Sequence, residues 1–119
     1  MNKYQVGMRG QQMAEFFLQR KGYRILAQNY RTTYGEIDLI ALHDAYIVFI
    51  EVKYRRGLAH GHPSESVTST KKQRIIKTAL HYISEHELSN QDFRFDVVEV
   101  LSHGTEAEIN HIKNAFDGV

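Results

Sequence analysis

Three residues of this 119-residue chain, Asp38, Glu51 and Lys53, have the types and spacing of a hydrolytic metal site. Glu51 and Lys53 stand two apart in the segment 46–54, whose alternating apolar pattern predicts a strand. Side chains two apart on a strand share one face of the sheet. The carboxylate of Glu51 and the ammonium of Lys53 are therefore predicted to point into the same space.

Asp38 is brought into this space by the hairpin that the sequence predicts. Gly35–Ala41 alternates as a strand, and a tight turn at Asp44–Ala45 would pair it with the next strand. In that register Asp38 faces Glu51 and Glu36 faces Lys53, with opposed Cβ atoms about 4.5–5.5 Å apart. All four side chains would then converge on one patch of one sheet face.

Two directly opposed carboxylates repel each other and should destabilise the hairpin unless a cation lies between them. Hard oxygen ligands, few in number, are typical of a Mg²⁺ or Mn²⁺ site that leaves positions open for water and phosphate. A lysine beside such a site could hold a water or stabilise the charge that grows on phosphorus. The alternative is structural: Glu36 and Lys53 could form an ordinary cross-strand ion pair, and a one-residue slip would separate the two carboxylates.

The elements that must position these residues follow from periodicity. Helices are predicted over 8–21 and from a capping box at Thr70–Gln73 onwards, and strands over 23–29, 35–41, 46–54 and 93–101. Residues 55–63, with two glycines and the only proline, are predicted to form a loop, and 109–116 could be a short strand or a turn. The first three strands should form an antiparallel meander, and the fourth should lie parallel to the third through a right-handed crossover.

Two patterns predict which side chains are buried. In the second strand Ile37, Leu39 and Ala41 should share one face. The second helix should bury its apolar positions, which are Ile75, Ile76, Ala79, Leu80 and Ile83. The fold class is therefore α/β, with the core order α-β-β-β-α-β and a mixed sheet of four to five strands flanked by helices.

The charge of the chain is unevenly distributed although its net value is only +1. Residues 53–77 carry seven basic side chains and one acidic one, whereas residues 78–119 carry two basic and eight acidic ones. The basic residues that flank the motif strand or open the second helix are candidates for contacts with nucleic-acid phosphates: Arg55, Arg56, Lys71, Lys72 and Arg74. A solvated helix face balanced by the acidic C-terminal third would account for the same charges.

The length and amino-acid composition of the chain limit the classes of protein to which it can belong. A length of 119 residues, with 42% hydrophobic and 24% charged residues, is typical of one globular domain, here 1–119. The absence of cysteine excludes disulfide scaffolds, zinc ribbons and thiol nucleophiles. No signal-peptide pattern and no membrane-length apolar run is present, so we expect a cytoplasmic protein without a membrane association.

The wider motifs resemble the YraN-type family, bacterial proteins predicted to be endonucleases of the restriction-endonuclease-like superfamily. The motifs that carry the resemblance are Asn29-x-Arg31, Gly35-Glu-Ile-Asp-Leu-Ile-Ala41, Phe49-Ile-Glu-Val-Lys53 with Arg55, Arg94-Phe-Asp-Val-Val98 and Asn114-Ala-Phe116. They span nearly the whole chain. The superfamily is identified by an Asp followed by Glu-x-Lys on neighbouring strands, the PD-(D/E)xK pattern, and archaeal Holliday-junction resolvases are similar compact members.

The resemblance implies a role for each central residue. Asp38 and Glu51 would be ligands of Mg²⁺ or Mn²⁺, with the Val52 carbonyl as a third, and Lys53 would position water or stabilise charge. Glu15 matches a first-helix glutamate that the resolvase-like members use, although an exposed helix position explains it equally well. The implied substrate is DNA, with branched and single-stranded forms among the candidates, and a homodimer would suit the cutting of two strands.

Two other classes of function remain open on the sequence alone. The same basic face could belong to a nucleic-acid-binding module that performs no hydrolysis. Alternatively, the sheet patch could be an ion-pair cluster in an interaction protein, which would bind no divalent metal.

Overall fold

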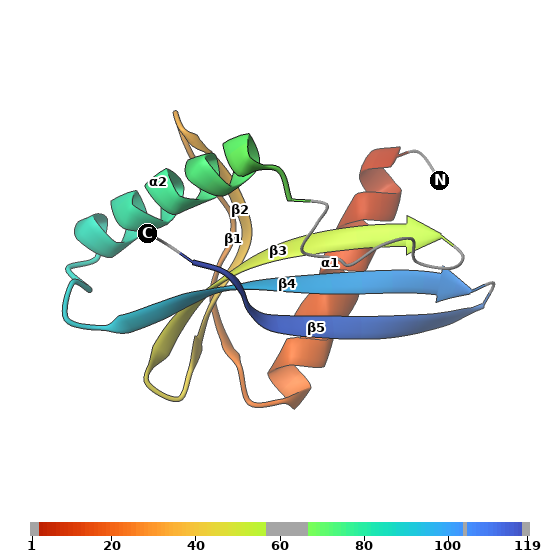
Figure 1. The fold of residues 1–119 in the computed structure, drawn as a ribbon. Helices are drawn as coiled ribbons and strands as arrows, with labels where there is room; N and C mark the ends of the chain where they lie inside the picture. Colours follow the sequence, from red (N-terminus) through yellow and green to blue (C-terminus); the bar gives the residue numbers. More distant parts are fainter. Residues whose placement is uncertain (1–2, 57–66, 104, 118–119) are drawn as a thin grey trace.

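A computed structural model describes residues 3–56, 67–103 and 105–117 of the chain (Figure 1). Its elements are α1 (Lys3–Arg20), β1 (Arg24–Thr32), β2 (Gly35–His43), β3 (Tyr46–Arg56), α2 (Ser69–Glu85), β4 (Asp92–His103) and β5 (Glu106–Phe116). The predicted order α-β-β-β-α-β is confirmed, and the undecided C-terminal segment is a full strand. Of the expected loop 55–63, Arg55 and Arg56 end β3 instead, and the rest lies outside the described residues.

The five strands form one mixed sheet in the order β1-β2-β3-β4-β5. Neighbouring strands are antiparallel except β3 and β4, which run parallel. A parallel pair needs a long connection, and α2 lies within that connection (Figure 1). The predicted α/β class is therefore confirmed, with the arrangement of a restriction-endonuclease-like core.

The two helices cover opposite faces of the sheet, because alternate residues of β3 pack into two separate cores. Ile47 and Phe49 belong to the core that contains Ala79 of α2. Val48 and Ile50 belong to the core that contains Leu18 of α1. Neither helix is long and apolar enough, over its described residues, to cross a membrane.

The prediction that Ile37, Leu39 and Ala41 share one face is wrong at Ile37. Ile37 packs in the core beneath α2, whereas Leu39 and Ala41 pack in the core beneath α1. The β1–β2 ladder pairs Ile37 and Leu39 with the two neighbours of Asn29, and Asn29 itself has a left-handed φ of 49°. The simple alternation is therefore broken at Asp38, between Ile37 and Leu39 and opposite Asn29.

Helix α2 begins two residues earlier than the predicted capping box. Thr68 is the N-cap, and its side-chain oxygen accepts a hydrogen bond from the Lys71 backbone N–H at 3.2 Å. Leu80 was expected in the core but is half exposed. Thr78 and Tyr82 are buried in its place, because the residues that face the sheet follow helical spacing from Ile75 onwards.

Strand β5 is held to β4 by a buried carboxylate. Asp96 accepts hydrogen bonds from Arg94 Nε at 3.0 Å and from the Asn114 backbone N–H at 3.0 Å, and His111 Nε2 lies 2.7 Å from it. Burial works against the charged form of Asp96, but His111, Arg94 and the Asn114 amide hold its pKa below the ordinary value. The β4–β5 register shifts at this point, between Phe95 and Val97. An irregular edge strand of this kind has no clean period, which explains why its sequence left the segment undecided.

Candidate functional site

The β2–β3 hairpin has the predicted register. The ladder runs from His43 opposite Tyr46 to Leu39 opposite Ile50, and Asp44 in the turn has a φ of 54°. Asp38 is the next residue along β2. Its Oδ2 accepts a hydrogen bond of 2.8 Å from the Val52 backbone N–H, so the carboxylate lies against β3 beside Glu51.

Asp38 and Glu51, termed here the carboxylate pair, lie side by side, with Glu51 buried and Asp38 partly buried. The side chain of Glu51 is 8% exposed, and the two carboxyl groups are close enough to share a hydrogen bond. Burial and then the Glu51 charge raise the pKa of Asp38 to about 7, against the opposing effect of the Val52 N–H. Burial beside a second carboxyl group thus disfavours the charged form of Asp38, and strongly shifted carboxyl groups of this kind gather at functional sites.

Two lysines lie beside the carboxylate pair. Lys71, held in the first turn of α2 by the Thr68 cap, places its Nζ 3.0 Å from Glu51 Oε1. Burial works to lower the pKa of Lys71, but Glu51 raises it above the ordinary value. Burial and the nearby Lys71 ammonium lower the pKa of Lys53. Two lysines and two carboxylates thus share one small space, which is a larger charged cluster than one simple ion pair.

The carboxylate pair opens into a cavity of about 520 Å³ between α1, the sheet and the start of α2. Its lining residues are Met8, Gln11, Asn29, Arg31, Glu36, Asp38, Glu51, Val52, Lys53, Tyr54 and Lys71. A smaller hollow of about 320 Å³ adjoins it and shares Glu36, Asp38, Glu51 and Lys71 with it. A cavity of this size, polar and open to solvent, can admit a phosphate group together with water.

Helix α1 reaches this cavity through Met8 and Gln11 and not through Glu15. Gln11 and Asn29 exchange two hydrogen bonds of 2.8 and 3.1 Å, and Asn29 also donates to Glu36 at 2.8 Å. Glu15 accepts a hydrogen bond from Gln28 and is absent from the cavity lining. Gln11 was not predicted from the sequence; the one sequence signal for it is the neighbouring Gly10, which lets α1 approach Tyr54 closely.

Glu36 is held by β1 and not by β3. Its carboxylate accepts from Arg31 Nε at 3.0 Å and from Asn29. The alternative in which Glu36 and Lys53 form an ordinary ion pair is therefore not the arrangement found. The Asn29-x-Arg31 motif instead supplies both hydrogen-bond donors to Glu36 at the edge of the cavity.

The structure brings two of the five predicted phosphate-contacting residues to the carboxylate pair. Lys71 and Arg74 line the smaller hollow. Arg55 Nε lies 3.1 Å from the buried carboxylate of Glu99, and Lys72 lies 5.6 Å from the centre of the Phe116 ring. The side chain of Arg56 lies outside the described part of the chain.

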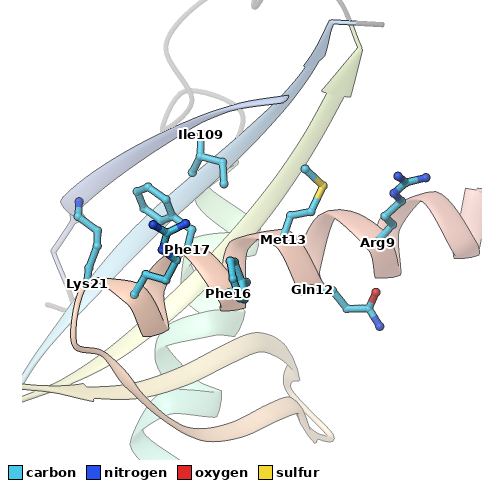
Figure 2. Close-up of a pocket in the computed structure, with 8 residues that line it drawn as sticks. Arg9, Gln12, Met13, Phe16, Phe17, Lys21 and Ile109 are labelled. Carbon is cyan, nitrogen blue, oxygen red and sulfur yellow. The ribbon is translucent and has the colours of Figure 1, made fainter. Parts of the chain in front are cut away.

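A third hollow, of about 700 Å³, lies away from this site and is lined by α1 and by Ile109 of β5 (Figure 2). Figure 2 shows Met13 and Phe17 of α1 on the side of the helix that faces Ile109. Phe16 also lines the hollow and is largely exposed. Arg9, Arg20 and Lys21 also line it, and no carboxylate does. It therefore has no ligands for a divalent cation and is separate from the carboxylate pair.

Comparison with known proteins places this chain among sequence relatives. The model of a family described as "Uncharacterised protein family UPF0102" matches residues 10–100. The chain belongs to the UPF0102 family. This is the YraN-type family that the sequence motifs indicated.

Relatives named as UPF0102 proteins match over most of their length. One from Alkaliphilus metalliredigens is 47% identical over 93% of this chain and 96% of its own. One from Caldicellulosiruptor saccharolyticus is 43% identical over 98% and 100%, and one from Syntrophotalea carbinolica is 42% identical over 94% and 91%. The UPF0102 match contains both members of the carboxylate pair, both lysines and the Gln11–Asn29–Glu36 chain.

The donor set of the site fits Mg²⁺ or Mn²⁺ better than a softer metal. It consists of two carboxylates, with the backbone of Val52 in the same cavity and no thiol or imidazole. Among the described residues no three His, Cys, Asp or Glu side chains come together as a metal-holding group. Mg²⁺ is usually bound by one or two carboxylates together with water and substrate phosphate, so an incomplete protein shell is suited to it.

Proposed function

We propose that this protein is a metal-dependent endonuclease that hydrolyses phosphodiester bonds of DNA. The observation that carries the proposal is the carboxylate pair beside Lys53 and Lys71 in one solvent-open cavity. Burial and the neighbouring Glu51 charge raise the pKa of Asp38 to about 7, and a cation bound between the two carboxyl groups would favour their charged forms.

Each residue has a proposed role. Asp38 and Glu51, with the Val52 carbonyl, would hold a Mg²⁺ or Mn²⁺ ion, which when bound supplies Lewis-acid polarisation of the phosphate and a more acidic water. Lys53, with its lowered pKa, would orient that water or stabilise the charge that grows on phosphorus. Lys71 and Arg74 would position the DNA backbone, which sets register without reading sequence. Glu15 is not included because it does not line the cavity.

The proposal includes a homodimer. One carboxylate pair can cleave one strand at a time, so two copies of the chain, assembled on the DNA, would cleave both strands of a duplex. DNA as the substrate also suits the cytoplasmic location expected from the sequence. Size-exclusion chromatography with and without duplex DNA tests the homodimer.

The test is a cleavage assay with Mn²⁺ and Mg²⁺ on linear duplex, single-stranded, flap and four-way-junction DNA. Wild type is compared with Asp38→Asn, Glu51→Gln and Lys53→Met. Asp92→Asn is the matched control, since Asp92 is an exposed carboxylate paired with Tyr46 at the opposite end of β3.

Metal-dependent cleavage by wild type and Asp92→Asn, lost by at least about 100-fold in the three site variants, supports the proposal. Cleavage that persists in folded Asp38→Asn overturns the assignment of the site. Salt-sensitive DNA binding with no cleavage by any variant would favour the alternative, a binding module that uses Lys71 and Arg74 without hydrolysis.

A further inference from the structure

We propose that Tyr34, together with Arg74 and Lys77, forms a stacking platform that binds an unpaired nucleotide of single-stranded DNA next to the carboxylate pair. The inference deepens the proposed function by naming a substrate class for the same site. Its binding part can be measured without any cleavage.

The ring of Tyr34 is available for contact. It lies in the turn between β1 and β2 and is 50% exposed, the most exposed of the tyrosines whose side chains are described. Tyr30 packs edge-on against Tyr82 at 5.1 Å, and Tyr54 packs against Gly10. Tyr34 is thus the aromatic residue near the cavity whose ring is not used for packing in the fold.

The turn that carries Tyr34 is fixed to α2, and Figure 1 shows the tip of this hairpin beside the helix. Thr32 Oγ1 lies 3.2 Å from Thr78 Oγ1 of α2, and the Tyr34 backbone N–H donates to Thr32 Oγ1 at 3.1 Å. A Cβ atom added at Gly35 would lie only 3.3 Å from Arg74 Cβ, so the glycine allows this close approach. The ring is therefore presented from a held turn, which reduces the entropy lost when a ligand stacks on it.

A row of cations on α2 joins the ring to the carboxylate pair. Lys77 Nζ lies 5.8 Å from the centre of the Tyr34 ring. Lys71, Arg74 and Lys77 follow one another at three-residue intervals, so the row runs about 9 Å along the helix axis. The smaller hollow is lined by Gly35, next to Tyr34, and also by Asp38 and Glu51. A strand that touches the ring would thus continue along the cations to the carboxylate pair.

These features favour single-stranded nucleic acid as the occupant. Proteins that bind single strands combine a cationic track for the backbone with an aromatic ring on which a base stacks. In a duplex the base faces are covered by neighbouring bases and cannot reach a ring at the surface. The platform therefore selects an unpaired end, flap or gap over an intact duplex.

The test is fluorescence anisotropy in EDTA with a labelled oligothymidine and a blunt duplex of equal length. Proteins are wild type, Tyr34→Ala, Tyr34→Phe and the control Tyr46→Ala. Tyr46 is also an exposed tyrosine with a cation nearby, Arg94 at 5.4 Å, but it lies at the far end of β3. Tyr34→Ala is expected to weaken single-strand binding by about 5-fold to 150-fold, the usual worth of one stacked base. Tyr34→Phe and Tyr46→Ala should stay within 2-fold of wild type, which is well below that range.

The inference is overturned if Tyr34→Ala weakens the binding of single-stranded and duplex DNA equally, or if it weakens the binding of neither. Circular dichroism melting of each variant separates loss of binding from loss of folding. The two proposals can fail separately. If Tyr34→Ala cleaves flap DNA as well as wild type does, the stacking proposal is wrong and the nuclease proposal stands. If single-strand binding depends on Tyr34 but no DNA is cleaved, the nuclease proposal is wrong and the stacking proposal stands.

Discussion

Replacing Asp38 by Asn is expected to make the metal-free protein more stable at pH 8 while abolishing its response to metal. The raised pKa of Asp38, about 7 against an ordinary 3.8, means that the folded protein holds its proton more tightly than the unfolded chain does. Between about pH 4 and pH 7 wild type therefore loses stability as the pH rises. A neutral amide at position 38 should remove that loss.

The magnitude follows from the pKa shift. A difference of about three pKa units corresponds to about 4 kcal/mol, which is the ceiling for the gain at pH 8. We expect about 1–3 kcal/mol, because water entry and side-chain movement relieve part of the repulsion in wild type. The amide oxygen of Asn can still accept from the Val52 N–H, and its NH₂ can donate to Glu51, so the local contacts are retained.

The assay is urea unfolding in EDTA at pH 5 and pH 8, followed by circular dichroism because the chain has no tryptophan. The increase in unfolding free energy caused by Asp38→Asn should be larger at pH 8 than at pH 5. Millimolar Mn²⁺ should raise the unfolding free energy of wild type at pH 8 and leave Asp38→Asn unchanged. Asp92→Asn serves as the control for a general change in charge.

One result would refute the reasoning. If Asp38→Asn is less stable than wild type at both pH values, the Asp38 carboxylate is satisfied in the fold and the site has no need of a cation. An equal gain at pH 5 and pH 8 would also show that ionisation of Asp38 is not the cause.

Three further outcomes follow from the contacts. Lys71→Met removes the ammonium beside Glu51, which would compete with a metal ion for that carboxylate. Calorimetric titration should therefore find tighter Mn²⁺ binding together with weaker DNA binding. Unchanged Mn²⁺ affinity would show that Lys71 and the metal do not compete. Gly10→Val would place a Cβ atom 2.7 Å from the Tyr54 ring and should cost about 1–3 kcal/mol in urea unfolding, and a smaller cost would show that α1 can shift freely. Asp96→Ala leaves the guanidinium of Arg94 and the buried ring of His111 without their carboxylate partner and should cost about 3–5 kcal/mol; a loss below 1 kcal/mol would mean that the β4–β5 contact does not depend on Asp96.

The local sequence pattern was sufficient to predict the centre of the site, where Asp38 lies beside Glu51. The alternation of β2 and β3 and the turn at Asp44–Ala45 decide which residues face each other, and the ladder has the register they predicted. Asp38 beside Glu51 could therefore be read from short-range rules, because a hairpin is formed by neighbours in the chain. The alternation failed at Ile37, which packs in the core beneath α2, and the break lies at Asp38, opposite the left-handed Asn29 of the adjacent strand.

Only the tertiary structure decided which residues surround the carboxylate pair. Lys71 contacts Glu51 and Lys72 does not, because the start and rotation of α2 on the sheet select one neighbour over the other. Gln11 reaches the cavity and Glu15 does not, because α1 crosses the sheet at Gly10. These are contacts between elements far apart in the chain. Which residues make these contacts depends on how whole helices dock on the sheet, and residue type and spacing within one helix do not determine that docking.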